Sequence, residues 1–504
     1  MQHERPRVSV VIPVYNSMPY LLSTLGSLAD QDLGDGELEV IAVDDGSTDG
    51  SGDALDAFAA KDPRFHVIHQ PNSGWPGMPR NRGMDRAQGD FVFFMDADDT
   101  MAPEALRTMI EDADAQSTDV VIPRMQGTGG RGVQGVFTKH PHGQISVSKA
   151  LETLSPQKLF RTDFLRENDI RFPEGKVRLE DGMFVAKAYV LARRIDILTR
   201  TPLYFIHQRD DGQNISSRPI DAAGYDNSVR VISEIVRAGT PDPAEADRLT
   251  LELFTRKGLR WYAPKRWIRM RPARQQEWFD LHHQFMLDMI PVGLENSVAK
   301  VEDQRKLRLL RAGDLQGMRQ LIQDGVNLEH QSLVRDVALR GAQLELVVRF
   351  TLPQVAVDAS SLTHSARMKI AFAAGRLLAP LQRWDMPGKV VRRLERVVGG
   401  ARPSVRLELG GRGSSKTASL EPRPGLWDAG EGTVEARFLV PHKVLRRFSG
   451  QIVDCWSVLC TPSGVPGPRF RVQAPSSLAG AAKAPVRPYA TVQGNFSIDL
   501  RGLK

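Results

Sequence analysis

The sequence predicts an α/β domain, a helical domain and an all-β sandwich, over residues 1–218, 219–340 and 341–504. Three observations lead to this prediction. Between residues 8 and 122, short apolar runs of strand type alternate with amphipathic stretches of helical period, the pattern of a mostly parallel sheet with helical crossovers. From Pro219 to about Asn327 the helical period continues alone. Beyond about Leu344, short apolar runs alternate with Gly, Pro and Ser turns, as in antiparallel sandwiches.

The composition is that of a soluble globular protein with an excess of basic residues. A length of 504 residues exceeds what one hydrophobic core serves, and the formal charge of +7 predicts a polyanionic partner or an anionic surface. No apolar stretch is long enough to cross a bilayer, and the first residues do not have the pattern of a signal peptide. Cys455 and Cys460 share one strand-like run, roughly 16 Å apart on opposite faces, which excludes a bond between them. We therefore expect a cytoplasmic protein.

Polar and aromatic residues follow the first two predicted strands, VSVVIPVY and LEVIAVDD. Pro13 and Tyr15 close the first strand, and Asp45 closes the second. Because open α/β sheets bind ligands at the carboxyl ends of their strands, the ring and the carboxylate could hold a base or a ribose. Alternatively, Asp45 starts a turn and a helix cap with the Gly-Ser-Thr that follows. The chain has neither the glycine-rich dinucleotide fingerprint nor a Walker loop.

A loop rich in glycine and proline, NSGWPGMPRNR, runs from Asn72 to Arg82 after the third predicted strand. Glycines allow close backbone approach, and the N-terminus of the helix that follows offers free N–H groups to an anion. Arg80 and Arg82 add charged donors to that first turn. An arginine at a helix N-terminus opposes the helix dipole, which favours anion contact by Arg80 over a solvated surface position.

The apolar run FVFFM, which reads as a buried strand, leads directly into three carboxylates within four residues. Such crowding is costly unless a cation or a cluster of donors neutralises it. We expect Asp99 or Thr100 to cap a helix that starts near Ala102-Pro103. This leaves Asp96 and Asp98 for a cation or a diphosphate.

Together, SVVIPVYNS, AVDDGSTDGS and NSGWPGMPRNRGMDRAQGDFVFFMDADD resemble family-two inverting glycosyltransferases of the GT-A fold. The resemblance implies a UDP-sugar donor and a bound Mn²⁺ or Mg²⁺. Asp98 would be the metal ligand, and Asp96 would contact the ribose and diphosphate. The residues implied to contact the nucleotide are Pro13, Tyr15, Asp45, Asn72, Arg80, Asp96 and Asp98.

Three further segments are similar to the bacterial subgroup that glycosylates wall teichoic acid: GTGGRGVQGVF, LSPQKLFRTDFLRENDIRFPE and LEDGMFVAKAYVLA. This similarity implies transfer of N-acetylglucosamine to poly(ribitol phosphate), with the Gly-Arg-Gly-Val and Leu-Ser-Pro-x-Lys segments beside the acceptor. Glu180-Asp181 matches the acidic pair of the family and implies Asp181 as the general base that an inverting transfer needs. By residue type alone, a role as partner of the helix dipole would be favoured, and the resemblance to the family reverses that preference. The subgroup's immunoglobulin-like C-terminal domains form trimers, which implies a homotrimer with an immunoglobulin-like sandwich here.

The loop after PLYFIH departs from the subgroup. Arg209 and Ser216-Ser217 match, and Arg209 is therefore expected at the donor. Asn214 stands where the subgroup has a histidine. If that histidine helps to bind metal or diphosphate, either Asn214 or His207 replaces it, or the task is dropped.

A basic segment, RKGLRWYAPKRWIRMRPAR, runs from Arg256 to Arg274 and contains two tryptophans and no acid. Basic residues interleaved with aromatics fit nucleic acid, a phosphodiester polymer or the anionic inner leaflet of the membrane. A solvated helical face is the alternative for any one residue. In the context of the family we expect the polymer, with possible peripheral membrane contact and no nucleic acid. A second basic stretch, residues 376–400, reads as a helix-like insertion in the all-β part.

The sequence thus predicts a metal-dependent inverting glycosyltransferase acting on a teichoic-acid-like polymer. The alternatives are transfer to another cell-envelope polysaccharide, and a non-catalytic phosphopolymer-binding scaffold. The intact acids Asp45, Asp96, Asp98 and Asp181 argue against the scaffold. A sugar-nucleotidyl transferase would need a glycine-rich basic loop after the first strand, where this chain has Pro13-Val14-Tyr15-Asn16.

Overall fold

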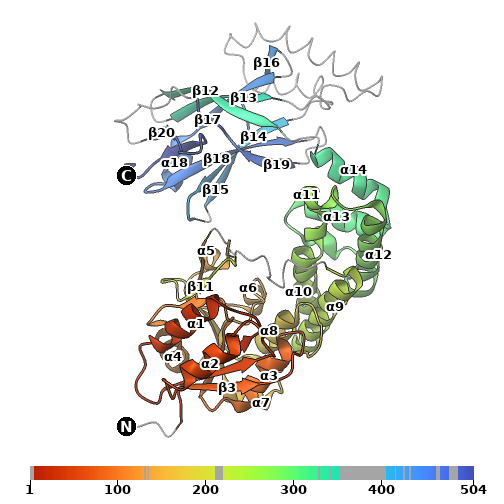
Figure 1. Cartoon of the computed structure of the whole chain (residues 1–504). Helices are drawn as coiled ribbons and strands as arrows, with labels where there is room; N and C mark the ends of the chain where they lie inside the picture. Colours follow the sequence, from red (N-terminus) through yellow and green to blue (C-terminus); the bar gives the residue numbers. More distant parts are fainter. Residues whose placement is uncertain are drawn as a thin grey trace. The chain divides into compact units, whose positions relative to one another are not determined.

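The computed structural model describes residues 5–129, 132–133, 135–209, 220–326, 330–340, 343–351, 404–414, 416–423, 426–430, 433–460, 466–475 and 486–503. The chain forms two compact units, Met1–Trp261 with Ala273–Ser297, and Tyr262–Pro272 with Val298–Lys504 (Figure 1). The predicted helical domain is shared between these units. Its division from its neighbours at residues 218 and 340 stays a prediction.

An eight-stranded sheet forms the centre of the first unit, with the strand order β3-β2-β1-β4-β9-β6-β10-β8. Its strands are β1 (Val8–Val14), β2 (Leu38–Asp44), β3 (Phe65–His69), β4 (Phe91–Phe94), β6 (Val120–Ile122), β8 (Gly143–Gln144), β9 (Leu159–Arg161) and β10 (Ile195–Ile197). The strands β1 to β4 pair in parallel, whereas β9 runs antiparallel between β4 and β6. The predicted α/β sheet with mostly parallel strands is confirmed where the nucleotide was expected.

Buried apolar side chains fix the helices against this sheet. The helices are α1 (Tyr20–Ala29), α2 (Ser51–Ala59), α3 (Gly77–Arg86), α4 (Ala105–Gln116), α5 (Val136–Lys139), α6 (Val147–Ala150), α7 (Thr162–Glu167) and α8 (Glu180–Leu191). Helix α3 packs closely on β1, because a Cβ added at Gly83 would lie 2.4 Å from Val11 Cγ1. On β4, the ring of Phe94 meets the ring of Phe184 from α8 at 5.3 Å between centroids. This packing brings α8 next to the strand that carries the acidic turn.

A small second sheet, in the order β5-β11-β7, overturns one expectation. It consists of β5 (Thr100–Met101), β7 (Met125–Gly127) and β11 (Tyr204–Ile206). The prediction that Asp99 or Thr100 caps a helix near Ala102-Pro103 is wrong, because Thr100 pairs with β11 and α4 begins only after Glu104, without a side-chain cap. Asp99 instead accepts hydrogen bonds from the Tyr204 hydroxyl at 2.8 Å and the His207 N–H at 3.0 Å. Its carboxyl group thus ties the start of β5 to β11.

Residues 222–326 are helical, as predicted. The elements are α9 (Ala222–Gly239), α10 (Pro243–Lys257), η2 (Leu259–Tyr262), α11 (Pro264–Trp267), α12 (Pro272–Met289), η3 (Leu294–Ser297), α13 (Val301–Ala312) and α14 (Leu315–Val326). The tryptophans of the basic segment are buried: Trp261 stacks on Trp278 at 3.8 Å, and Trp267 packs on Tyr262 at 4.8 Å. These rings therefore belong to helical cores and are not available to stack on a ligand.

Antiparallel strands form two sheets in the second unit, in the orders β12-β13-β17-β16 and β15-β14-β18-β21-β20, with β19 paired to β18. They are β12 (Gln331–Arg340), β13 (Gln343–Thr351), β14 (Ser404–Gly411), β15 (Thr417–Leu420), β16 (Leu426–Gly430), β17 (Thr433–Val440), β18 (Ile452–Cys460), β19 (Pro466–Arg471), β20 (Arg487–Ala490) and β21 (Phe496–Asp499), with the helix α18 (His442–Arg447) after β17. Both sheets contribute to one core, for example through Phe438 and Leu407. The predicted all-β part is confirmed, and an immunoglobulin-like arrangement stays a prediction. The predicted insertion at 376–400 lies outside the described residues.

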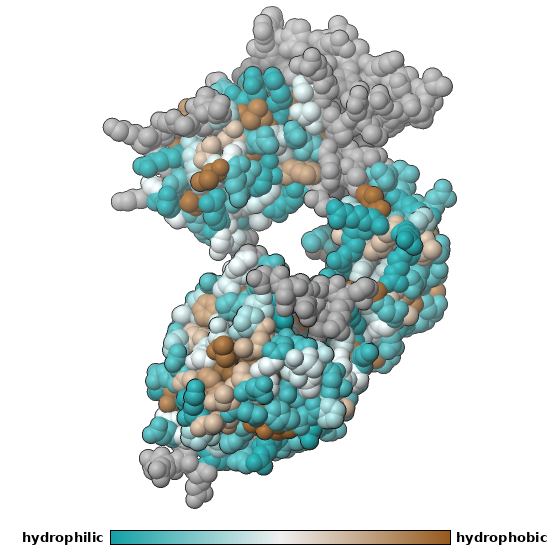
Figure 2. Space-filling model, in the orientation of Figure 1, coloured by the Kyte–Doolittle hydropathy of each residue, from teal (hydrophilic) through white to brown (hydrophobic). Residues whose placement is uncertain are grey.

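The strand β18 carries both cysteines, as the sequence predicted, and Cys455 is a buried free thiol. Among the described helices, none combines the length and apolar character that a membrane crossing requires. Figure 2 shows hydrophilic side chains over most of the coloured surface on the face in view, with apolar ones scattered between them.

Candidate active site

The first two strands end side by side and place Tyr15 and Asp45 at one edge of the sheet. Val14 pairs with Asp44 in parallel register, and the Asp45 N–H donates to Val14 O at 2.8 Å. Tyr15 is 46% exposed, whereas Asp45 is buried. Pro13, the second-last residue of β1, is half-buried. An accessible ring and a carboxylate therefore share the carboxyl edge of the sheet.

Three donors fix the Asp45 carboxylate. Gln70 Nε2 donates to it at 2.6 Å, and Ser73 donates through its backbone N–H at 2.9 Å and its hydroxyl at 2.8 Å. The loop that carries Ser73 passes directly over Gly46, where an added Cβ would lie 2.8 Å from the backbone nitrogen of Asn72. Gly46 also has a φ of +72°, so only glycine suits this crossing. The crossing brings the exposed Asn72 to the same edge as Asp45.

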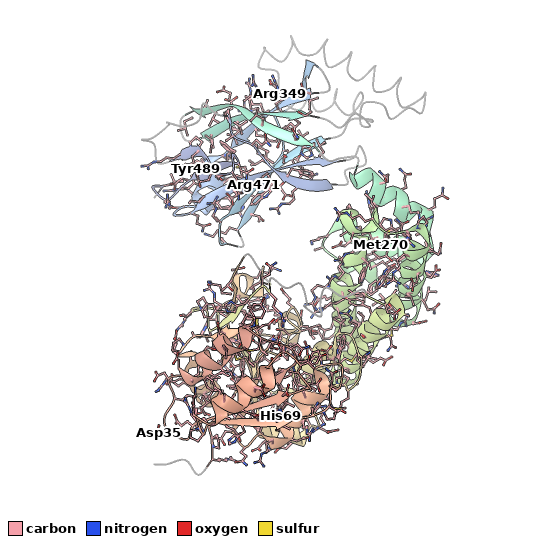
Figure 3. The ribbon with its side chains drawn as sticks, viewed as in Figure 1. Asp35, His69, Met270, Arg349, Arg471 and Tyr489 are labelled. Carbon is pink, nitrogen blue, oxygen red and sulfur yellow. The ribbon has the colours of Figure 1, made fainter. Side chains whose placement is uncertain are left out.

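Asp44 stabilises the turn after β2 and leaves Asp45 for the edge. Asp44 accepts from the Ser47 N–H at 3.0 Å and lies 3.0 Å from His69 Nδ1. His69, which Figure 3 labels, also has its Nε2 3.0 Å from Asp56. The hydrogen bonds to Asp44 and Asp56 raise the pKa of His69. The turn-forming role that the sequence allowed for Asp45 therefore falls to its neighbour.

Arg80, in the first turn of α3, is the charged centre of the site. Its Nη1 lies 2.5 Å from Asp181 Oδ1 and 3.9 Å from Glu180 Oε1, and its Nη2 donates to Asp96 Oδ1 at 2.9 Å. The side chain is only 4% exposed. Burial lowers the pKa of Arg80, but Asp181, Asp96 and Glu180 more than offset this, so its pKa lies above the ordinary value. Arg80 thus joins the acidic turn after β4 to the start of α8.

The acids after β4 separate into one buried and two accessible groups. Asp99 is buried, whereas Asp96 and Asp98 are half-buried. Asp96 Oδ2 accepts from Gln157 Nε2 at 2.6 Å, and the Asp96 N–H donates to the Tyr204 hydroxyl at 3.2 Å. Burial, followed by the charges of Asp96 and Asp98, raises the pKa of Asp99 to about 8. Asp99 therefore carries a proton at neutral pH, and the negative charge of the turn rests on Asp96 and Asp98.

The side chains around Asp98 suit a divalent cation that protein and ligand hold together. Mg²⁺ and Mn²⁺ prefer carboxylate oxygens, and in phosphate-transfer sites Mg²⁺ commonly uses one or two carboxylates plus substrate phosphates. In the described part of the chain, no group of three or more His, Cys, Asp and Glu side chains could hold a metal ion. The acids present therefore fit a cation shared with a diphosphate and do not form an all-protein metal site there.

His207 is engaged within the second sheet. Its Nε2 lies 2.9 Å from the Thr100 hydroxyl and its Nδ1 lies 2.8 Å from the Thr128 hydroxyl. Burial lowers the pKa of His207, so the ring is neutral at physiological pH. Asn214, the other candidate, lies outside the described residues, as do Gly130 and Arg131 of the predicted acceptor hairpin.

Arg209 and Arg82 lie near the strand ends in different environments. Arg209 Nη2 donates to the backbone oxygen of Asn16 at 3.2 Å, and its guanidinium lies 5.0 Å from the centroid of the Tyr20 ring. Arg209 is therefore beside the end of β1, where the donor was predicted. Arg82 donates to Gln70 Oε1 at 3.1 Å and so supports the side chain that holds Asp45.

Glu180 and Asp181 form the first turn of α8, directly after Leu179 in the left-handed conformation. Burial, followed by the charge of Asp181, raises the pKa of Glu180 to about 8. Burial also raises the pKa of Asp181, but the Arg80 and Lys158 charges oppose the shift. The Asp181 side chain is 31% exposed, against 9% for Glu180. Asp181 is thus the accessible acid of the pair and the one in direct contact with Arg80.

Lys158 belongs to this site, although sequence reasoning did not single it out. Its side chain is fully buried, and its Nζ donates to Ser155 O and lies 6.0 Å from the centroid of the Tyr189 ring. Burial lowers the pKa of Lys158 to about 7, against the attraction of Asp181. The available signal was a lysine directly before the apolar residues of β9, in the segment predicted to border the acceptor.

We expect Lys158→Met to unfold at a higher temperature than the wild type below pH 7. The folded-state pKa of about 7 lies below the ordinary lysine value of 10.5. The wild type therefore bears the full cost of its buried ammonium below pH 7, on the order of a few kcal/mol, and loses that cost as the pH rises towards 10.5. Thermal unfolding at pH 6, 8 and 9.5 should show the stability advantage of the variant shrinking with rising pH. The exposed Lys61, changed to Met, is the control, and a Lys158→Met variant less stable than wild type at every pH would contradict the prediction.

A second lysine reaches the site from α10. Burial, followed by repulsion from Arg256 and Arg260, lowers the pKa of Lys257 to about 8, while Asp181 opposes the shift. Arg256 donates to Leu151 O and so ties the end of α10 to the segment before β9. The basic segment of the sequence therefore begins close enough to Asp181 to share its electrostatic field.

Known protein families account for most of these features. The family model described as "Glycosyl transferase family 2" matches residues 9–180, which include the strand ends, Arg80 and the acidic turn. The N-terminal part of the chain is a family-two glycosyltransferase domain. The model described as "Glycosyl transferase TarS linker domain" matches residues 222–322, the helical part that follows. The predicted family and the predicted helical linker are both confirmed.

Two curated relatives of this glycosyltransferase carry related names. The chain is 34% identical over 252 residues to "Poly(ribitol-phosphate) beta-N-acetylglucosaminyltransferase TarS" of Staphylococcus aureus, covering 50% of this chain and 44% of the relative. It is 32% identical over 321 residues to "Poly(ribitol-phosphate) beta-glucosyltransferase" of Bacillus spizizenii, covering 62% and 50%. The chain thus spans about half the length of these curated relatives.

Solved structures agree with this family. The crystal structure of S. aureus TarS 1–349 in complex with UDP-GlcNAc has a TM-score of 0.59 and 28% identity, over 68% of this chain and 96% of that one. The crystal structure of S. aureus TarS has a TM-score of 0.59 at 21% identity, over 98% of this chain and 84% of that one. At that identity, the second match shows a similar fold alone.

Proposed function

We propose that the protein is an inverting glycosyltransferase that moves N-acetylglucosamine from UDP-GlcNAc to a hydroxyl of a teichoic-acid-like polyol phosphate polymer. One observation carries the proposal: Arg80 contacts Asp181 at 2.5 Å and Asp96 at 2.9 Å through its two terminal nitrogens. A transfer of this kind needs the group that holds the leaving diphosphate and the group that deprotonates the acceptor at one reaction centre. Two carboxylates on one guanidinium meet that requirement.

The donor would lie across the strand ends. Tyr15 and Asp45 would hold the uracil, Asp96 the ribose and diphosphate, and Asp98 the divalent cation, which would offset charge on the leaving diphosphate. The remaining proposed contacts are Pro13, Asn72, Arg80 and Arg209. The UDP-GlcNAc complex of the solved TarS supports this donor. The name of the B. spizizenii relative makes UDP-glucose the second candidate.

Asp181 would act as the general base. One of its carboxylate oxygens takes the proton of the acceptor hydroxyl as that oxygen attacks C1 of the sugar. The bond from C1 to the diphosphate oxygen breaks on the opposite face, and its electron pair leaves with UDP, so the configuration inverts. Glu180, with a pKa of about 8, is protonated at neutral pH and does not compete for the proton.

The acceptor side of the site is basic, which suits a polyanion. Lys257 lies within the field of Asp181, and the exposed Arg260 follows it in η2. The buried Trp261 and Trp267 remove the rings that would stack on nucleic acid bases, which disfavours that partner. A cytoplasmic location, peripheral contact with the inner leaflet and a homotrimer remain part of the proposal.

The proposal is tested by incubating the protein with labelled UDP-GlcNAc or UDP-glucose and Mn²⁺. The acceptors are poly(ribitol phosphate), poly(glycerol phosphate) and a neutral envelope polysaccharide. We expect label to enter poly(ribitol phosphate) from UDP-GlcNAc. Transfer only to the neutral polymer would support the other envelope polysaccharide as acceptor. If the protein binds the polymer but neither transfers sugar nor hydrolyses the UDP-sugar, the result would support the non-catalytic scaffold.

A further inference from the structure

The guanidinium of Arg80 contacts carboxylates, although Arg80 is expected to hold a diphosphate. Both terminal nitrogens point at carboxylates, Nη1 at Asp181 and Nη2 at Asp96. The side chain is only 4% exposed, and its buried Nε has no hydrogen-bond acceptor among the described residues. Arg80 therefore retains donor capacity, but a new anion can use it only if an existing contact loosens.

The contact with Asp181 is the one expected to loosen. Asp96 is held from its other side by Gln157 at 2.6 Å and from its backbone by Tyr204, so it is fixed without Arg80. Among the described residues, the ion-pair partner of Asp181 is Arg80, and the Asp181 side chain is 31% exposed. An anion that binds beside Asp96 therefore reaches Arg80 while Asp96 stays in place, and Asp181 is the partner that can move away.

We infer that Asp181 and the donor diphosphate compete for Arg80, so that donor binding releases the base from its ion pair. The inference rests on the proposed function, because it assumes that the diphosphate binds beside Asp96. A carboxylate held 2.5 Å from a buried guanidinium is a weaker proton acceptor than the same carboxylate freed from it. Release of Asp181 would therefore activate the base only when the sugar to be transferred is present. Such coupling is reciprocal, since whatever removes Asp181 must also favour the diphosphate.

Because the coupling is reciprocal, it can be tested by measuring the affinity for UDP by calorimetry at pH 8 in the presence of Mn²⁺. Wild type, Asp181→Asn, Arg80→Met and the double variant are compared. We expect Asp181→Asn to bind UDP about fivefold or more tightly than wild type. In the Arg80→Met background, the same change should leave UDP affinity unaltered, because the contested group is gone.

Each other outcome overturns the inference. Unchanged or weaker UDP binding by Asp181→Asn excludes competition. Tighter binding that persists without Arg80 indicates plain repulsion between Asp181 and the diphosphate. If Arg80→Met does not fold, Arg80→Lys replaces it, and the tightening should shrink because one ammonium cannot bridge two carboxylates.

A control and the wild type separate this inference from the proposed function. Asp85 lies on α3, as Arg80 does, and forms an exposed ion pair with Arg171. Asp85→Asn should therefore not change UDP affinity. If wild type does not bind UDP at all, the proposed function fails and the competition fails with it. If wild type binds UDP and transfers sugar but Asp181→Asn binds no tighter, only the competition fails.

Discussion

Replacement of Asp181 by Asn is expected to lower the rate of sugar transfer by roughly 10²- to 10⁴-fold, the usual contribution of a positioned general base. The amide keeps the shape of the side chain but cannot accept the acceptor's proton. UDP-sugar binding should persist and tighten, since none of the proposed uracil contacts involves Asp181 and its loss frees Arg80 for the diphosphate. Initial rates with labelled donor, together with UDP titration, measure both effects.

Two variants control this result. Asp85→Asn removes an exposed, ion-paired acid from α3 and should keep wild-type turnover. Glu180→Gln replaces a group whose pKa of about 8 already keeps it protonated at neutral pH. The transfer rate of Glu180→Gln should therefore fall much less than that of Asp181→Asn. Near wild-type turnover of Asp181→Asn would show that another group is the base.

The pH profile offers an independent check on the same residue. A general base works only when ionised, so activity is lost as the pH falls through its pKa in the folded enzyme. Burial raises the pKa of Asp181 above the ordinary aspartate value of 3.8. The acid limb of kcat/KM is therefore expected at a higher pH than that value. An acid limb at or below it would contradict the assignment of Asp181.

Much of the fold follows from local patterns in the sequence. The strands β1, β2 and β4 are continuous apolar runs because helices cover both faces of the sheet, and such runs are easily recognised. The β-strands of the second unit alternate buried and half-buried residues, as Thr433–Val440 does, and this period is equally visible. The strand Thr100–Met101 escaped prediction because its two residues are defined only by pairing with Tyr204–Ile206, about a hundred positions later. A two-residue strand has no period of its own.

The candidate site divides in the same way. Residues that follow a strand, such as Asp45 and Asp96, could be placed at one edge because parallel strands end together. The contact between Arg80 and Asp181 joins positions 101 residues apart, and no sequence spacing encodes it. Lys158 was missed because a lysine beside apolar residues ordinarily keeps its charge in water, and only the packing of α8 and β9 buries it.

Replacement of Asp98 by Ala is expected to remove activation by Mn²⁺ and to lower transfer roughly 10²-fold or more. Asp96 shares the guanidinium of Arg80 with Asp181. A divalent cation held by Asp98 would offset the charge that develops on the leaving diphosphate. Without the Asp98 carboxylate, titration of the transfer rate with Mn²⁺ should be flat up to millimolar concentrations, whereas wild type should rise and saturate.

The neighbouring acid supplies a matched control for this experiment. Asp99 is one residue away, but it is buried, and its pKa of about 8 keeps it protonated at neutral pH. Asn at this position reproduces an uncharged side chain that can still accept from the Tyr204 hydroxyl. Asp99→Asn should therefore keep the Mn²⁺ response of wild type while Asp98→Ala loses it. If both variants retain the response, the cation is not held by this turn, and if only Asp99→Asn loses it, the ligand is Asp99 and the accessible acid has another task.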